Sequence, residues 1–186
     1  TQDCALGGHF AYAYIDGSCS NFNINQSNIL CAGSSIQLTA PLGFATYTWT
    51  LPNGTFQLGQ TINTGLAGVY TLNMTTMTGC PGPTLTYTLI AYPKPNSNFT
   101  PTQSTACSPN FTFTNTSTIS VGYIANSLWG FGDGFTSSTM HPNHNYLSLG
   151  NYSVSLISTS NMGCIDTTII PVSIQPAPID RKSTRL

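Results

Sequence analysis

Few residues of this chain could carry out acid–base or nucleophilic chemistry. The 186 residues include five Asp, no Glu and three His. Glycosidase chemistry needs two facing carboxylates, and each Asp here falls in a different predicted turn or terminus. The chain has no GxSxG nucleophile elbow and no Gly-rich phosphate loop, although a Ser-His-Asp triad assembled in space stays open. We therefore predict no catalytic residues and no enzyme.

Asp133, His141 and His144 are the residues that suggest a metal site. A calcium ion needs about six to eight oxygen ligands, usually with several carboxylates. The second half of the chain offers only Asp133 and Asp166 before the tail. The two histidines have no third ligand close in sequence. We predict that Asp133 accepts backbone amide hydrogen bonds in a tight turn, and that the protein holds no metal and no cofactor.

The composition indicates strands and excludes two classes of partner. Charged residues make up 5% of the chain, the net charge is -1, and hydrophobic residues make up 40%. Soluble helices normally carry Glu, Lys and Arg on their wet faces, whereas Thr, Val, Ile, Tyr and Phe suit a pleated sheet. No basic patch favours nucleic acid, and no apolar stretch is long enough to span a membrane. We expect neither nucleic-acid binding nor membrane insertion.

One series of residues occurs twice along the chain, which is typical of repeated modules. The two copies are Cys31, Trp49, Gly68, Tyr70, Gly79, Cys80 and Cys107, Trp129, Gly150, Tyr152, Gly163, Cys164. Segments 35–40, 47–51, 69–74, 85–90, 111–115 and 152–157 alternate apolar and polar residues, as strands do. Asn53-Gly54 predicts a hairpin turn. The series predicts an all-β fold of two tandem immunoglobulin-like β-sandwich modules.

The predicted modules cover residues 28–92 and 95–176. Segment 92–98 contains two prolines and is interpreted as a linker. Residues 1–27 do not fit the repeat and are interpreted as the last strand of a preceding domain or an N-terminal extension. Residues 177–186 hold three of the four basic residues. They are interpreted as a linker with a non-native tail.

The six cysteines indicate disulfides and therefore an oxidising, extracellular location. No CxxC pair suggests a zinc or redox site. The repeat predicts one disulfide within each module, Cys31–Cys80 and Cys107–Cys164, each contributing about 4 kcal/mol in the chain-entropy model. Cys4 and Cys19 are placed to bridge the ends or the neighbours of a strand over 9–16.

The aromatic members of the repeat have predicted structural roles. Trp49 and Trp129 stand where a sandwich places its central core aromatic. Tyr70 and Tyr152 each follow Gly-x and fit a tyrosine corner, in which the hydroxyl bonds nearby backbone.

The second module resembles the PKD domain, an immunoglobulin-like β-sandwich. It carries WGFGDG at 129–134, HPNHNY at 141–146 and GNYSVSL at 150–156. The resemblance implies structural roles for Trp129, Asp133, Tyr152, a packed His144 and the following Tyr146. The family usually has Asp after the Trp, where this chain has Gly130. The first module looks like the bacterial Ig-like domains that accompany PKD repeats in large surface proteins.

The resemblance implies a non-catalytic structural or adhesion module of a large exported bacterial surface protein. Its partners would be neighbouring domains of the same polypeptide, with extracellular polysaccharide or self-association as further hypotheses. Two alternatives stay open. One is a carbohydrate-binding accessory module of a secreted enzyme, with aromatics such as Phe10, Tyr12, Tyr14 or Phe135 as a platform. The other is a subunit of an extracellular filament joined by strand edges.

Overall fold

The computed structural model describes residues 28–176, and every regular element in this range is a β-strand. The all-β prediction is therefore confirmed. No helix in the described range has the length and hydropathy needed to cross a membrane. The predictions on Cys4, Cys19, the aromatics of segment 9–16 and the terminal segments 1–27 and 177–186 lie outside the described residues.

The chain divides after Tyr92 into two compact units. Unit 1 denotes here the described residues 28–92, and unit 2 denotes residues 93–176. Each unit encloses a hydrophobic cluster of its own, and the two clusters share no residue. The division falls within the segment 92–98 that was predicted to be a linker.

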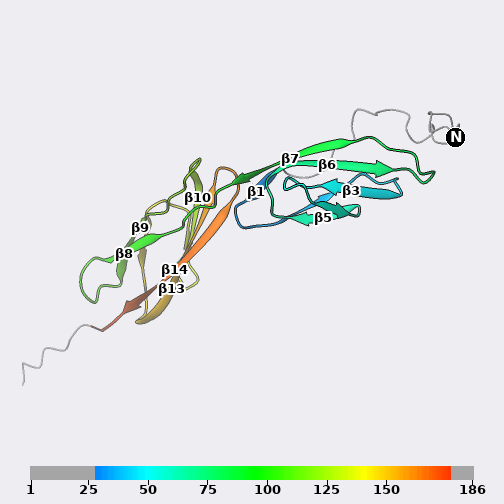
Figure 1. Ribbon diagram of the computed structural model, residues 1–186. Helices are drawn as coiled ribbons and strands as arrows, with labels where there is room; N and C mark the ends of the chain where they lie inside the picture. Colours follow the sequence, from blue (N-terminus) through cyan, green and yellow to red (C-terminus); the bar gives the residue numbers. More distant parts are fainter. Residues whose placement is uncertain (1–27, 177–186) are drawn as a thin grey trace, which may run out of the picture. The chain divides into compact units, whose positions relative to one another are not determined.

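Unit 1 consists of a five-stranded sheet and a strand pair (Figure 1). Its strands are β1 (Ile29–Cys31), β2 (Ile36–Thr39), β3 (Thr46–Thr50), β4 (Phe56–Leu58), β5 (Thr61–Thr64), β6 (Gly68–Thr75) and β7 (Leu85–Tyr92). The order in the large sheet is β1-β7-β6-β3-β4, and β2 pairs with β5. Only β1 and β7 run parallel within this unit. Trp49 and Leu72 of one layer and Leu38 and Ile62 of the other share the core.

Unit 2 consists of a four-stranded and a three-stranded sheet (Figure 1). Its strands are β8 (Phe99–Gln103), β9 (Asn110–Asn115), β10 (Ile124–Gly130), β11 (Thr136–Ser137), β12 (Asn143–Asn145), β13 (Gly150–Ser160) and β14 (Ile165–Ile174). The sheet orders are β11-β10-β13-β14 and β12-β9-β8. Alternate residues of facing strands fill the core, because successive side chains of a strand point to opposite faces. Phe113, Trp129 and Leu156 are among them.

The strands predicted within residues 28–176 all overlap observed ones. Segments 35–40, 47–51, 69–74, 85–90, 111–115 and 152–157 overlap β2, β3, β6, β7, β9 and β13. Short strands such as β4 and β11 were not predicted, since neither has an alternating pattern long enough to detect.

The two tryptophans occupy the same place in their units. Trp49 and Trp129 are both fully buried. Each indole Nε1 donates to a backbone oxygen ten residues further on, Trp49 to Gly59 at 3.0 Å and Trp129 to Thr139 at 2.9 Å. This bond satisfies the one polar atom of the ring and ties the strand β3 or β10 to the segment that follows its hairpin.

The two repeated tyrosines likewise make one kind of bond. The Tyr70 hydroxyl donates to the Leu66 carbonyl at 2.6 Å, and the Tyr152 hydroxyl donates to the Ser148 carbonyl at 2.9 Å. In both cases the acceptor lies four residues earlier, so the ring closes the bend that leads into β6 or β13. This is the geometry of a tyrosine corner.

Ser97 attaches the end of the predicted linker to unit 2. Its backbone N–H donates to Asp166 Oδ2 at 2.8 Å, and its hydroxyl contacts the Leu156 carbonyl and Ser158 Oγ, each at 3.1 Å. Ser97 is only 3% exposed. Residues from Ser97 onward therefore belong to the sandwich, and Asp166 serves to hold this entry segment.

Both predicted disulfide pairings are wrong. Cys31 and Cys164 each take part in a disulfide, whereas neither Cys80 nor Cys107 does. In unit 1 the register places Cys31 opposite Tyr92, at the end of β7. Cys80 precedes the start of that eight-residue strand. Because a strand rises about 3.3 Å per residue, the two cysteines lie at opposite ends of the sheet, far beyond the roughly 7 Å limit between bridged Cα atoms.

The same error applies in unit 2. Cys164 follows the 11-residue strand β13. The β8–β9 loop that holds Cys107 lies at the other end, where Tyr146 donates its backbone N–H to Pro109. The two cysteines of each copy of the repeated series are therefore not close to each other within their unit.

Candidate functional site

The turn that follows β10 sets up the most distinctive side-chain cluster of unit 2. Phe131 donates its backbone N–H to the Phe135 carbonyl at 3.0 Å, which closes a tight loop over 131–135. Gly132 has a φ of +84°. A Cβ at this position would lie 2.9 Å from the backbone N and O of Ser153. Only glycine allows this close approach, and the loop then presents Asp133 back toward the sandwich.

Asp133 is bound by its own turn and by β12. Its Oδ1 accepts the Phe135 backbone N–H at 3.2 Å, and its Oδ2 lies 2.7 Å from His144 Nε2. The side chains of His144 and Asp133 are 12% and 15% exposed. The turn interpretation predicted the first contact. The contact with His144 was missed.

His144 is fixed by aromatic rings on two sides. Its imidazole stacks on Phe131 with ring centroids 4.1 Å apart and planes 2° apart. Tyr146 meets the same imidazole edge to face at 4.6 Å. The Tyr146 hydroxyl is also engaged, donating to the Phe131 carbonyl at 3.0 Å. Packing and hydrogen bonding together thus fix the ring that faces Asp133.

The cluster shifts the ionisation of two of its members. Partial burial opposes the charge on Asp133, but the hydrogen bonds from His144 and the Phe135 amide, together with the imidazole charge, outweigh it and lower the pKa of the carboxyl below its ordinary value. Burial, and next the nearby Asp133 charge, raise the pKa of the Tyr146 phenol well above its usual range. Asp133 is therefore held as a carboxylate and Tyr146 as a neutral hydrogen-bond donor.

His141 takes no part in this cluster. Its Nδ1 accepts the backbone N–H of Asn115 at 3.1 Å. Within residues 28–176, no group of three or more His, Cys, Asp or Glu side chains is placed to hold a metal ion.

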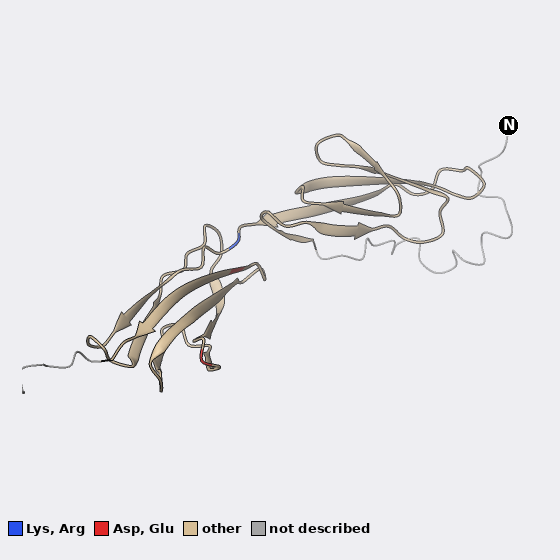
Figure 2. Ribbon diagram, turned by 90° about the horizontal axis from the view of Figure 1, so that it is seen from below, with Lys and Arg blue, Asp and Glu red and all other residues tan. Residues whose placement is uncertain are grey.

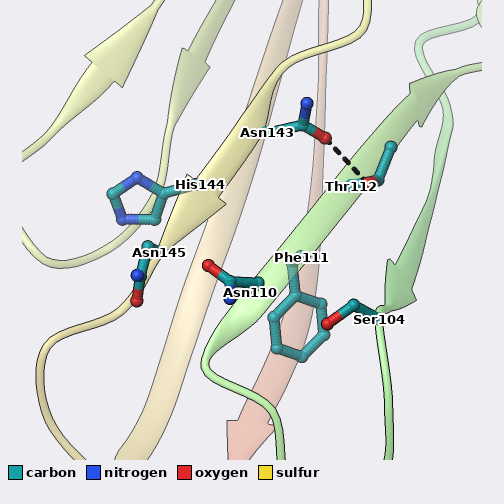
Figure 3. A pocket seen from close by; sticks show the side chains of 7 residues that line it. All are labelled: Ser104, Asn110, Phe111, Thr112, Asn143, His144 and Asn145. Atoms are coloured by element: carbon teal, nitrogen blue, oxygen red, sulfur yellow. Dashed lines mark hydrogen bonds between the residues drawn. The ribbon is translucent and has the colours of Figure 1, made fainter.

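A surface pocket of about 340 Å³ lies beside the cluster, over the three-stranded sheet. Figure 3 shows side chains from β9 and β12 around it, with the Thr112 hydroxyl bonded to Asn143 Oδ1 at 2.7 Å. Its lining contains no Lys, Arg, Asp or Glu, and it consists of Ser104, Asn110, Phe111, Thr112, Asn143, His144 and Asn145.

Comparison with known proteins identifies unit 2. The family model of the PKD domain matches residues 92–174. That range includes the tryptophan, the aspartate turn, the histidine and the corner tyrosine described above. Residues 92–174 are a PKD domain.

Relatives of known name contain similar sequence. An 88-residue stretch is 39% identical to a microbial collagenase of Vibrio alginolyticus, and it represents 47% of this chain and 11% of the collagenase. Two crystal structures of PKD1 domains are also similar to part of the chain, each with a TM-score of 0.42. One is from the Vibrio cholerae metalloprotease PrtV, with 31% identity over 45% of this chain and 99% of that chain. The other is from Vibrio anguillarum Epp, with 29% identity over 44% and 94%.

The PKD domain of this chain departs from the family pattern at Gly130. A Cβ at Gly130 would lie 2.8 Å from Ser155 Oγ on the neighbouring strand. Ser155 Oγ instead donates to the Gly130 carbonyl at 3.5 Å. A bulkier residue here would require the Ser155 hydroxyl to turn away.

The Asp133–His144 pair had one usable signal in the sequence. Asp133 is the only acidic residue in the Trp129 hairpin, and His144 lies 11 residues later on the next strand but one. Pairing them required knowing that β12 returns across the turn, and spacing along the chain does not specify this.

Proposed function

We propose that this chain is a non-catalytic extracellular module of a larger exported bacterial protein, with a spacing and attachment role. One observation carries the proposal: the hallmark residues of the PKD domain are bound to one another or to backbone. These are Trp129, Asp133, His144, Tyr146 and Tyr152. Side chains occupied in this way stabilise a domain and do not turn over a substrate.

Unit 1 supports a role built on tandem modules. Its tryptophan and corner tyrosine make the same bonds as those of the PKD domain. We therefore propose that unit 1 is an Ig-like module of similar architecture, and that the chain consists of two such modules in series. Compact modules without charge-rich surfaces suit a connecting segment between functional parts of a long polypeptide.

The microbial collagenase offers a second setting for the same role. This chain spans about 11% of that relative's length. In a protein of that kind, the chain would be an accessory module that holds a catalytic domain close to an extracellular polymer. Large adhesive proteins and secreted hydrolases would both use the module for attachment.

Binding and turnover assays on the full chain test this proposal. We expect the chain to be retained by at least one extracellular polymer among collagen fibrils, mucin and insoluble polysaccharides, without release of peptides or sugars. The control is a Trp129→Ala chain, which should lose retention if a folded PKD domain is needed. Product release by the purified chain, or retention by none of the polymers, would contradict the proposal.

A further inference from the structure

We propose that the pocket over the three-stranded sheet of the PKD domain binds a neutral, hydroxyl-rich polysaccharide chain. The inference rests on the proposed attachment role and names its ligand class and its site. The contact residues are Ser104, Asn110, Thr112, Asn143 and Asn145 (Figure 3).

Two rows of polar side chains cross the sheet at this point. The register pairs Asn110 with Asn145 and Thr112 with Asn143. On the side of β8, the backbone N–H of Ser104 donates to the Asn110 carbonyl at 3.1 Å, and Ser104 thereby extends the first row. All five residues are exposed. The four residues of β9 and β12 occupy alternate positions of their strands, and they therefore share the outer face of the sheet.

The two asparagines of the first row are close neighbours. The backbone N–H groups of Phe113 and Tyr146 donate across β9 and β12 at 2.9 and 3.0 Å. Hydrogen-bonded and non-hydrogen-bonded pairs alternate along two antiparallel strands. Asn110 and Asn145 lie one position from the hydrogen-bonded pair of Pro109 and Tyr146, so they form a non-hydrogen-bonded pair. At such pairs the Cβ atoms are about 4.5–5.5 Å apart.

The carboxamides of Asn110 and Asn145 are also available. Among the described residues, neither carboxamide has a hydrogen-bond partner, whereas Asn143 is held by Thr112. The face therefore offers two adjacent amides, each with donors and an acceptor, beside a pre-oriented third. Vicinal sugar hydroxyls, which both donate and accept, match this set. The volume of about 340 Å³ is within the usual range for a small-molecule site.

The charge distribution argues against other ligand classes. The described residues contain only three charged side chains, Lys94, Asp133 and Asp166 (Figure 2). None of them lines the pocket. Nucleic acids and acidic glycans require Lys or Arg, and a hard cation requires carboxylates. A protein interface would need exposed Trp, Tyr or Arg anchors, which the lining lacks.

Affinity measurements on the full chain test the site. The probes are soluble neutral polysaccharides (hydroxyethylcellulose, laminarin, glucomannan and dextran), with alginate as the charged comparison and collagen as the protein comparison. We expect at least one neutral probe to bind and alginate not to bind. Added salt should leave the affinity unchanged, because there is no charge pair to screen. The N110A/N145A variant should weaken binding by at least about tenfold through loss of the carboxamide hydrogen bonds.

Asn126→Ala is the matched control. Asn126 is an exposed asparagine on β10 that lines a different pocket on the other sheet. Its loss should leave binding unchanged, and near-ultraviolet circular dichroism should show all variants folded. Binding to no neutral probe, or equal binding by N110A/N145A and wild type, overturns the site. If collagen is retained while every neutral probe fails, the ligand class is wrong and the attachment role stands.

Discussion

The hairpin after the core tryptophan is closed by the same backbone hydrogen bond in the two units, but it carries different side chains. In unit 1, Leu51 donates its N–H to the Thr55 carbonyl at 2.9 Å, as Phe131 does to Phe135 in unit 2. Asn53 Oδ1 accepts the Thr55 N–H at 3.2 Å, which corresponds to the Asp133 contact in unit 2. The predicted Asn53-Gly54 hairpin is thus present, with the positive φ at Gly54.

The side chains opposite this hairpin differ more strongly. Unit 2 places His144 against the turn carboxylate, whereas the turn of unit 1 carries a neutral amide. Six residues before the corner tyrosine, unit 1 has Thr64, which bonds the Tyr70 hydroxyl at 2.7 Å. Unit 2 has Tyr146 there, stacked on Tyr152 at 4.2 Å. A frame made largely of backbone bonds therefore accepts different polar interiors, and within the described residues only unit 2 places an imidazole against a carboxylate.

Removing either tryptophan should produce the largest effect and test whether the two cores are separate. Trp49→Ala and Trp129→Ala each delete a fully buried indole. We expect each to lower the free energy of unfolding of its own unit by about 3–5 kcal/mol. Calorimetry should show one transition shifted in each variant and the other unchanged. A common shift of both transitions would contradict the assignment of two separate cores.

Gly132→Ala should destabilise the PKD domain more than Gly134→Ala. Both residues have positive φ, at +84° and +96°. Placing a residue with a Cβ in this region of backbone conformation lowers the folding stability by about 1–2 kcal/mol. At Gly132 the new Cβ also meets backbone atoms of Ser153 at 2.9 Å, whereas at Gly134 nothing lies within 4 Å. Urea unfolding should therefore show that Gly132→Ala lowers the free energy of unfolding by more than about 2 kcal/mol. Equal losses would show that the loop relaxes away from β13.

Loss of the tyrosine hydroxyl should affect unit 1 more than unit 2. The fully buried Tyr70 hydroxyl bonds both Leu66 and Thr64, so Tyr70→Phe removes two hydrogen bonds, one of them to the buried Thr64 hydroxyl, and should cost about 1–3 kcal/mol. The Tyr152 bond to Ser148 is solvent-exposed, and Tyr152→Phe should cost about 0.5–1.5 kcal/mol. Thermal unfolding of both variants measures the difference. A larger loss for Tyr152→Phe would contradict the greater cost expected for losing the buried Tyr70 bonds.

Asp133→Asn should have the smallest effect and one confined to unit 2. Because the folded-state pKa of Asp133 is lowered from 3.8, its charge stabilises the fold above that pH. That stability is lost as the pH falls through the lower folded-state pKa. The wild-type chain should therefore be more stable than Asp133→Asn at neutral pH. This difference in stability should become smaller below about pH 4.

Asn53→Asp is the control for this pH effect. Asn53 is exposed and holds only its own turn, through Thr55. The new carboxylate would have no histidine partner among the described residues, so unit 1 should gain little acid dependence. Unfolding curves of both variants between acidic and neutral pH measure this. If unit 1 of the Asn53→Asp variant became sensitive to acid, the backbone turn alone would be enough to lower the pKa of the carboxyl, without a histidine such as His144.

Strand positions were more predictable than side-chain partners. Alternation located β3 and β6 because burial on one face forces a period of two. The tyrosine bonds also followed, since each acceptor lies four residues earlier in the same chain segment. The pocket could not be predicted, because Asn110 and Asn145 become neighbours only through the register of β9 and β12.

The sequence by itself determined the all-β class and the two sets of repeated core residues, because alternation and turn chemistry act over a few residues. Only the tertiary structure decided which distant side chains meet. It separated Cys31 from Cys80 and Cys107 from Cys164 by placing the members of each predicted pair at opposite ends of a unit. It also brought His144 to Asp133. Such contacts depend on strand order and register, and residue type and spacing do not encode these locally.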